Sequence, residues 1–260
     1  MAKAKVALGI DIGGSGIKGA PVDLATGKLL APRLKIATPE KSTPNAVAAI
    51  VDEIADSFAD ELPKGAPIGV TIPGVVQHGI VRTAANIDKS WIDAAGEDIF
   101  SKALGRTCLL VNDADAAGVA EDRFGAAADK EGLIVLTTLG TGIGIALIHD
   151  GVLIPNCELG HMEVNGHDAE TRAASSAKDR EGLKYKEWAQ ERLQPYYKRL
   201  EDLLWPDLFV VGGGVSRKAD RFLPYLELRT PIIPAGLQNE AGIVGAAALA
   251  ADREAGAKPL

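Results

Sequence analysis

Two stretches of this chain repeat one pattern, a strand, a glycine-rich turn and a second strand, and this repetition limits the folds open to it. The first covers residues 8–20 and the second residues 133–148. Before each turn, apolar residues alternate with small or polar ones, which is the period of a β-strand. Glycines lack side chains, so backbone N–H groups can approach an anion closely there. The repeat predicts an internal duplication. For one stretch alone, an ordinary hairpin and a phosphate site are equally good interpretations.

The first turn carries polar groups that suit phosphate chemistry. Asp11 ends the first strand, where its carboxylate could hold a hydrated Mg²⁺ near phosphates. Ser15 offers a hydroxyl and Lys18 a cation. The turn is not a Walker A loop, because Lys18 does not stand in a Gly-Lys-Ser or Gly-Lys-Thr sequence. It is not the dinucleotide fingerprint either, because no helix evidently follows the glycines.

The remaining periodicities predict strands that alternate with helices, which is typical of an α/β fold. Helices are expected from Thr43–Pro44 to Phe58, over 114–124, over 188–204 with an interruption at Pro195, and over 241–251. Strands are expected over 68–72 and 109–111, and a third glycine turn follows a strand at Gly212–Gly214. We expect a smaller N-terminal domain, residues 1–112 plus the C-terminal helix region 239–260, and a larger domain over 113–238.

Composition excludes several classes of function. The chain has 260 residues, 47% hydrophobic and 24% charged, as soluble globular proteins do. A net charge of −7 argues against general nucleic-acid binding. No apolar run is long enough to cross a membrane, and the start leads straight into a strand without a signal peptide. Two cysteines are too few for a disulfide framework. We therefore expect a cytoplasmic protein with no membrane or nucleic-acid partner.

Taken together, these motifs resemble the sugar kinase and actin superfamily, and in detail its ROK (repressor, open reading frame, kinase) family. Asp11–Ser15 with Lys18 is similar to the first phosphate motif of that family, and Leu139–Gly144 to the second. Glu158–His161 is similar to its sugar-binding Glu-x-Gly-His motif. Segments 165–170, 188–189 and 206–208 resemble the bacterial polyphosphate glucokinases within the family, of the type that uses polyphosphate or ATP on glucose and mannose.

The resemblance implies a two-domain actin-like (ribonuclease H-like) fold with an active-site cleft between the domains. It implies phosphoryl transfer from inorganic polyphosphate or ATP, with Mg²⁺, to the 6-hydroxyl of glucose. It also implies mannose as a further acceptor, and a homodimer. An ATP-only hexokinase is the alternative. A sugar-responsive repressor of the family would need a helix-turn-helix before the first motif, and no room for one is expected here. The Glu158–His161 motif argues against an actin-like ATPase.

Roles carried over from the family fall on matching residues. Asp113, after the strand at 109–111, is the expected base that accepts the proton of the sugar hydroxyl, although Asp113 or Asp115 could instead cap the following helix. The expected hexose-binding residues are Asn86, Asn112, Asp113, Glu158, His161 and Glu170. The expected phosphate-donor residues are Asp11, Gly13, Gly14, Ser15, Lys18, Thr141, Gly142, Gly213 and Gly214. Close packing of helix on strand is an equally good interpretation of any single glycine from 212 to 214.

The chain departs from most ROK proteins after His161, where those proteins carry a cysteine-rich zinc loop. The corresponding residues 170–177 contain no cysteine, and a tetrahedral Zn²⁺ needs about four nitrogen or sulfur ligands. We therefore predict no zinc, and magnesium held through the phosphates, with Asp11 as the candidate protein ligand. A basic segment could line a track for the polyphosphate chain, although a solvated helical face explains most of its members. Its residues are Lys178, Arg180, Lys184, Lys186, Arg192, Lys198 and Arg199.

Overall fold

The computed structural model of the chain describes residues 5–257. Its internal contacts divide the chain into two compact units. One comprises Met1–Ala120 with Glu240–Leu260, and the other comprises Glu121–Asn239. Each unit contains a five-stranded sheet of its own. An α/β chain with two structural units is therefore confirmed.

The sheet of the first unit has the strand order β3-β2-β1-β4-β7. Its strands are β1 (Val6–Gly13), β2 (Gly16–Asp23), β3 (Leu34–Ile36), β4 (Ile68–Ile72) and β7 (Leu109–Asn112). The strands β1, β2 and β3 pair antiparallel, whereas β4 and β7 add in parallel to β1. The carboxyl ends of β1, β4 and β7 therefore lie at one edge of this sheet, where ligands bind in open α/β sheets.

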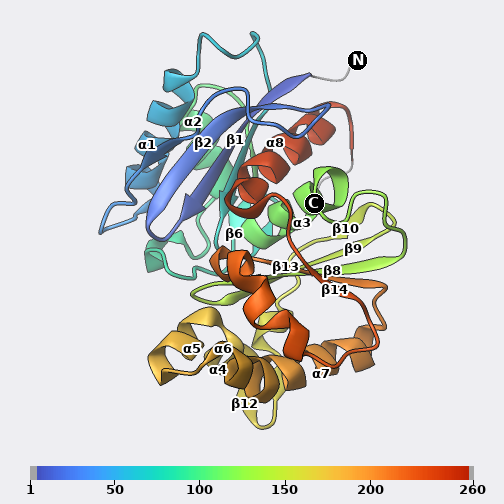
Figure 1. Ribbon diagram of the computed structural model, residues 1–260. Coiled ribbons are helices and arrows are strands. Elements are labelled where there is room, and N and C mark those ends of the chain that lie inside the picture. Colours follow the sequence, from blue (N-terminus) through green and yellow to red (C-terminus); the bar gives the residue numbers. More distant parts are fainter. Residues whose placement is uncertain (1–4, 258–260) are drawn as a thin grey trace. The chain divides into compact units, whose positions relative to one another are not determined.

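The two faces of this sheet are covered by different helices (Figure 1). Leu8, Ile10 and Ile12 of β1 belong to the same buried core as the apolar face of α1 (Pro44–Ser57). A Cβ added to Gly9 would lie 1.9 Å from the Ile243 carbonyl oxygen of α8 (Ala241–Glu254). Because side chains alternate along a strand, Gly9 lets α8 pack directly on the backbone of the other face. The C-terminal helix thus packs on the first half of the chain, as predicted.

Smaller elements complete the first unit. The hairpin β5 (Val76–Gln77) and β6 (Ile80–Val81) follows β4, and α2 (Gly96–Ala103) packs beside α1. Short 3₁₀ turns occupy η1 (Lys89–Trp91) and η6 (Gln238–Glu240).

The sheet of the second unit repeats the plan of the first, with the order β10-β9-β8-β13-β14. Here β8, β9 and β10 pair antiparallel, and β13 and β14 add in parallel to β8. The strands are β8 (Leu133–Leu139), β9 (Ile143–His149), β10 (Val152–Ile154), β13 (Leu208–Gly212) and β14 (Ile232–Pro234). The same strand order with the same directions confirms the predicted internal duplication.

Helices inserted after β10 give the second unit a second layer around a core that combines aliphatic and aromatic side chains (Figure 1). They are α4 (Ala169–Ala173), α5 (Ser175–Glu181), α6 (Tyr185–Trp188) and α7 (Gln194–Leu204). A π-helical segment, Ala189–Leu193, joins α6 to α7, and Pro195 lies in the first turn of α7. The proline lacks an N–H and disturbs the turn before it, which explains the irregularity predicted within 188–204.

The remaining short elements of this unit lie between the sheet strands and these helices. They are the hairpin β11 (Glu163–Val164) and β12 (His167–Asp168) and the 3₁₀ segments η2 (Leu159–His161), η4 (Gly214–Arg221) and η5 (Leu223–Tyr225).

The boundary between the units differs from the expected position near Asn112, because it falls within α3 (Asp113–Phe124). The first half of α3 touches α8, since a Cβ added to Gly245 would lie 1.7 Å from the Ala116 carbonyl oxygen. The buried carboxylate of Glu121, one turn later, accepts backbone hydrogen bonds from Gly236 and Leu237 of the second unit.

Candidate functional site

The first glycine hairpin presents a carboxylate and an ammonium group side by side. Register places Asp11 opposite Lys18, and Nζ of Lys18 lies 3.3 Å from Oδ2 of Asp11. The hydroxyl of Thr71 on β4 donates a 2.9 Å hydrogen bond to Oδ1 of Asp11. A Cβ added to Gly242 in the first turn of α8 would lie 2.9 Å from that same oxygen. The Asp11 carboxylate is therefore held from two sides, near the N-terminal end of a helix.

The turn itself is open to solvent. Gly14 and Ser15 are exposed, and a Cβ added to Gly14 would make only ordinary contacts, 3.5 and 3.6 Å, with atoms of Asn86. Asn86 is also exposed and has a left-handed backbone, with φ of 58°. The structure thus brings Asn86 next to Gly14, and the packing of the protein does not itself demand a glycine at position 14.

The structure at the start of α3 shows which residue caps the helix. The sequence left open whether Asp113 caps this helix or acts as the base. Oδ1 of Asn112 accepts hydrogen bonds from the backbone N–H groups of Ala114 and Asp115, at 2.8 and 3.0 Å. Its amide group donates to the Gly74 carbonyl at 3.0 Å. Asn112 is therefore the residue that caps the helix, and these bonds occupy most of its side chain, which was expected to bind hexose.

Asp113 is the first residue of α3 and is half-buried. Its Oδ1 accepts a 2.9 Å hydrogen bond from the N–H of Ala114. Helix N-termini carry partial positive charge, which favours an ionised carboxylate there. Because β7 ends at Asn112, Asp113 lies at the same sheet edge as the end of β1.

The second glycine hairpin is braced from outside. The backbone N–H of Ser176 donates to the Gly140 carbonyl at 3.0 Å, and its hydroxyl donates to the Thr141 carbonyl at 2.6 Å. Nothing lies within 4 Å of a Cβ added to Gly140, so this position is open among the described residues 5–257. At Gly142 a Cβ would fall 2.3 Å from a carboxylate oxygen of Glu170. Packing inside the protein therefore explains Gly142, independently of any donor.

In the third turn, too, packing requires one glycine and leaves the other open. Gly213 has φ of +79°, and a Cβ there would lie 2.4 Å from the Leu139 carbonyl oxygen. Gly214 follows at the start of η4, is exposed, and has no atom within 4 Å of an added Cβ in the described part of the chain. The positive φ and the close Leu139 backbone of β8 thus explain Gly213, whereas Gly214 leaves room for a ligand. Register pairs Gly212 with Thr138, so this turn and the second hairpin lie at one sheet edge.

The Glu-x-Gly-His motif is supported by a residue that the sequence reasoning missed. Nδ1 of His161 lies 2.9 Å from Oδ2 of Asp168, and Nε2 lies 3.8 Å from Oε2 of Glu158. Asp168 also caps α4, because its other oxygen accepts the N–H of Glu170 at 3.0 Å. An aspartate directly before a helix is a readable capping signal. Its pairing with His161 depends on the β11–β12 hairpin, which the sequence did not predict.

Burial and neighbouring charges shift the pKa values of His161 and Glu158 in this motif. The hydrogen bond with Asp168 raises the pKa of His161, and the nearby carboxylates of Glu170 and Glu158 add to that effect. Burial raises the pKa of Glu158, while His161 works against the shift. The neighbouring carboxylates therefore shift His161 toward its protonated form, in which Nε2–H can donate a hydrogen bond to a hydroxyl oxygen.

Glu170 closes this group onto the second hairpin. Its Oε2 accepts a 2.8 Å hydrogen bond from the N–H of Ile143, directly after the glycine turn. One carboxylate therefore connects the Glu-x-Gly-His group with the phosphate motif of the same unit.

The predicted site residues thus form two groups, one in each unit. The first unit holds Asp11, Gly13, Gly14, Ser15, Lys18, Asn86, Asn112 and Asp113. The second unit holds Thr141, Gly142, Glu158, His161, Glu170, Gly213 and Gly214. The structure also adds Thr71, Ser176 and Asp168 as supporting residues.

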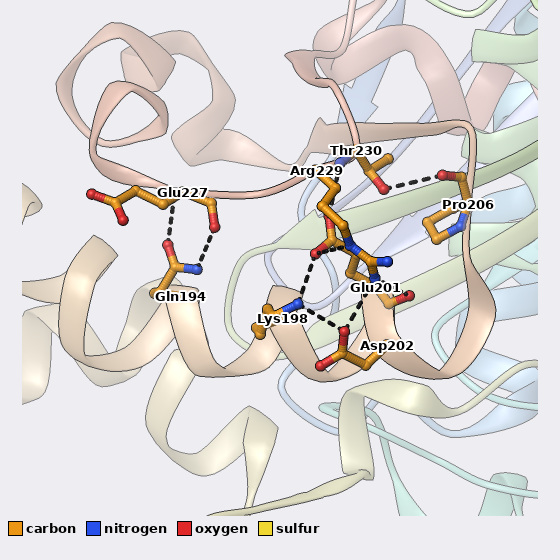
Figure 2. Close-up of polar contacts among 8 residues, drawn as sticks. All are labelled: Gln194, Lys198, Glu201, Asp202, Pro206, Glu227, Arg229 and Thr230. Atoms are coloured by element: carbon orange, nitrogen blue, oxygen red, sulfur yellow. Dashed lines mark hydrogen bonds and ion pairs between the residues drawn. The ribbon is translucent and has the colours of Figure 1, made fainter.

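Much of the basic segment is engaged in ion pairs. Lys198 contacts Glu201 and Asp202 at 3.2 and 2.7 Å, and Arg229 reaches the same two carboxylates (Figure 2). Burial opposes ionisation of Glu201, but hydrogen bonds from Thr230, Lys198 and Arg229 lower its pKa to about 2. Arg229 and Thr230 tie α7 to the segment before β14 through these carboxylates, and Lys198 pairs with the same two groups from within α7.

Within residues 5–257, no helix is long and apolar enough to cross a membrane. The same part of the chain contains no group of three or more His, Cys, Asp or Glu side chains placed to hold a metal ion. The absence of zinc stays a prediction.

Comparison with known proteins identifies similar chains. The model of the ROK family matches residues 7–181. The polyphosphate glucokinase of Mycobacterium tuberculosis is 54% identical over 240 residues, which cover 92% of this chain and 89% of that protein. The crystal structure of the inorganic polyphosphate/ATP-glucomannokinase from Arthrobacter sp. strain KM is 51% identical, with a TM-score of 0.91 over 95% of this chain and 99% of that one.

A more distant structure shares the fold. The ROK family glucokinase from Streptomyces griseus, solved with glucose and AMPPNP, has a TM-score of 0.80 at 24% identity, over 95% of this chain and 99% of that chain.

Proposed function

The chain belongs to the ROK family, and on that premise we propose that it transfers a phosphoryl group from inorganic polyphosphate or ATP to the 6-hydroxyl of glucose. Mannose is the second acceptor that we propose. The observation that carries the donor is the 54% identity to a polyphosphate glucokinase over 92% of the chain. The named activity of the Arthrobacter relative supports both donors and the second sugar.

Asp113 is the proposed general base. Phosphoryl transfer is mostly positioning and charge stabilisation, and the attacking hydroxyl must lose a proton. Asp113 is held by the N-terminus of α3, while Asn112 supplies the helix cap. The capping role, which competed with catalysis in the sequence, is therefore met by another residue. In the ionised form, the Asp113 carboxylate accepts the proton of the 6-hydroxyl as the new P–O bond forms.

Hexose binding is proposed for Glu158, His161 and Glu170, with Asn86 and Asn112 as further contacts. Glu158 accepts hydrogen bonds from sugar hydroxyls, and His161 donates one. Asp168 fixes the imidazole through its 2.9 Å contact, so the ring is oriented before the sugar arrives. Because a polar group that the bound sugar covers without a partner costs free energy, a sugar that lacks the matching hydroxyl binds less well.

The donor is proposed to bind at the glycine turns. At Gly140 and Gly214 the described chain leaves the space beside the Cα open, and at Gly14 an added Cβ would make only ordinary contacts with Asn86, so a phosphate can approach the backbone N–H groups. Lys18 is the cation of the first turn, and Thr141 and Ser15 offer hydroxyls. Gly13, Gly142 and Gly213 shape the turns.

Magnesium fits the residues at this edge as a hydrated ion. Asp11 is a carboxylate, which is the donor type that Mg²⁺ prefers, and Mg²⁺ keeps several waters and takes phosphate oxygens in such sites. Both oxygens of Asp11 are already bonded, to Lys18 and Thr71, which suits contact through water. When bound, the ion neutralises phosphate charge. We also propose a homodimer, which rests on the family resemblance, and a cytoplasmic location, which rests on the composition of the chain.

A coupled assay across two donors and two sugars tests the proposal. We expect hexose 6-phosphate from glucose and from mannose with either polyphosphate or ATP. Activity with ATP alone would favour the alternative, an ATP-only hexokinase of the same family. If neither donor supports phosphorylation of either hexose, the proposal is overturned.

The variant Asp113→Asn tests the base. We expect kcat to fall by at least about a hundredfold, the scale of general-base loss. Calorimetric glucose binding by the variant is the control for folding. A folded Asp113→Asn protein with nearly normal kcat would contradict the assignment.

A further inference from the structure

A small pocket lies behind the sugar motif of the second unit, and the proposed function does not use it. It is lined by the β11–β12 hairpin, α4 and the junction between the π-helical segment and α7, with a volume of about 70 Å³. The residues that matter for its chemistry are His167, Arg172, Glu191, Arg192 and Tyr196. An open hollow that contains Lys198 and Arg199 shares its Val164, Asn165 and Pro195 wall.

Three residues of the pocket have buried donors with no hydrogen-bond acceptor in the described chain, residues 5–257. They are Nε of Arg172, Nε of Arg192 and the hydroxyl of Tyr196. Tyr196 is 0% exposed, so its hydroxyl cannot be satisfied by bulk water. Leaving such groups unpaired is costly, and native proteins rarely do so. Their common location points to a ligand that supplies acceptor atoms.

The charge around the pocket favours an anion. Glu181 pairs with Arg192 at 3.1 Å and with Arg172 and Arg180 at 3.9 and 3.8 Å. Glu191 adds one contact with Arg192, at 3.6 Å. The pocket wall itself holds two guanidinium groups, of Arg172 and Arg192, and one carboxylate, of Glu191, which leaves one positive charge over. Guanidinium groups suit oxyanions in particular, because their N–H groups match two oxygens at once.

Tyr196 remains a donor at every ordinary pH. Burial raises the pKa of Tyr196 well above its usual value, and the neighbouring Tyr197 and Glu170 raise it further. The influence of Glu170 also shows that the pocket lies within electrostatic reach of the sugar motif.

The size of the pocket selects a small ligand. A volume of about 70 Å³ is far below the roughly 300–1,000 Å³ of sites for whole small molecules. One tetrahedral oxyanion fits such a space, whereas a hexose or a nucleotide does not.

We propose that this pocket binds a single phosphate group through Arg172, Arg192 and Tyr196. The phosphate is either free orthophosphate or the phosphoryl group of a monoester whose remainder lies in the adjoining hollow. The pocket is separate from the glycine turns, and the inference does not depend on the proposed function. Its walls include the hairpin that carries Asp168 and the helix that carries Glu170, so an occupied pocket would stiffen the support of His161.

Two neighbouring tyrosines make a matched test in the full-length protein. Tyr196→Phe removes the unpaired hydroxyl, and Tyr197→Phe removes one that is bonded to Thr137 at 2.6 Å. Without phosphate, we expect Tyr197→Phe to lower Tm and Tyr196→Phe to leave it equal or higher, because only the former loses a bond. With orthophosphate, the wild type and Tyr197→Phe should gain thermal stability, and Tyr196→Phe should gain less.

Affinity gives the second readout, by equilibrium dialysis with labelled orthophosphate. Binding at the glycine turns is common to all variants, so the difference between Tyr196→Phe and Tyr197→Phe reports the pocket. A hydrogen bond to a charged group is strong enough that its loss should weaken this component by about tenfold or more. Arg172→Gln should do the same, and the exposed Arg180→Gln should not.

The ligand source is decided by repeating the titration with glucose 6-phosphate. The quantity compared is the affinity of each anion for the component of binding that Tyr196→Phe weakens. If glucose 6-phosphate binds there more tightly than orthophosphate, the pocket is a monoester site. If it binds equally or more weakly, the pocket is a site for the free ion. If both anions bind Tyr196→Phe and wild type equally, the pocket holds only water and the proposal is wrong.

Discussion

Gly213 and Gly214 are adjacent, yet the structure predicts opposite consequences when each is replaced by alanine. At Gly213, alanine must adopt φ of +79° and place its Cβ 2.4 Å from the Leu139 carbonyl oxygen. The left-handed backbone costs about 1–2 kcal/mol. Relief of the contact costs about 1–3 kcal/mol more, as overpacking does. We expect Gly213→Ala to destabilise the protein by about 2–5 kcal/mol, from these two contributions.

At Gly214 the protein offers neither obstacle. The φ is not in the left-handed region, and no atom of the described chain lies within 4 Å of the added Cβ. Replacing glycine where the backbone tolerates alanine stabilises by about 0.4–1 kcal/mol, because the unfolded chain loses freedom. The added methyl group, however, occupies the space proposed for a donor phosphate. A lost charge-assisted hydrogen bond then raises the donor KM by about tenfold or more.

The assay combines thermal unfolding with steady-state kinetics on both variants. A loss of about 2 kcal/mol corresponds to a drop in Tm of at least about 4 °C for a chain of this size, which Gly213→Ala should show. Gly214→Ala should keep or raise Tm, keep the hexose KM and raise the KM of both donors. An unchanged donor KM in Gly214→Ala would refute the placement of phosphate at this turn, and so would an equal rise in the hexose KM.

Three further predictions concern ionisation, metal and donor. Asp168→Asn should lower the pKa of His161 toward its usual value of about 6.5, as followed by NMR. Because that pKa is raised, the pairing stabilises the fold at acidic pH and the benefit is lost as pH rises through the folded-state pKa, so Asp168→Asn should lose stability mainly below that pH. Metal analysis should find no stoichiometric zinc, and Mg²⁺ should restore activity after strong chelation; tightly bound zinc required for folding would show the opposite. Raising salt at constant Mg²⁺ should increase the KM of long polyphosphate more steeply than that of ATP, since contacts among many charges are screened most, and the two donors should compete; non-competitive inhibition between them would contradict a shared site.

Local sequence signals predicted most of the elements, because each depends on residues close together in the chain. Alternation in residues 8–20 and 133–148 predicted both hairpins, and their similarity predicted the duplicated sheets. Pro195 predicted an irregularity that the structure places in the π-helical segment before it. Both glycine turns that were expected to bind phosphate lie between the predicted strands.

Only tertiary packing decided what several of these residues do. Gly142 and Gly213 belong to phosphate motifs by pattern, but distant atoms of Glu170 and Leu139 occupy the space beside them. Gly214 has the same residue type and an open surrounding. Sequence cannot separate these cases, because the deciding neighbour of Gly213 lies more than seventy positions away in the chain.

The same holds for the polar groups. The pattern around 112–115 contained three residues able to cap α3, and the structure assigns the cap to Asn112 through its bonds to Gly74 and the helix amides. The boundary between the two units lies inside α3, because the Glu121 carboxylate accepts hydrogen bonds from the backbone N–H groups of Gly236 and Leu237, far along the chain. Local order along the chain thus determined the elements and their motifs. The partners of each side chain were decided by the fold, since they come from segments that only folding brings together.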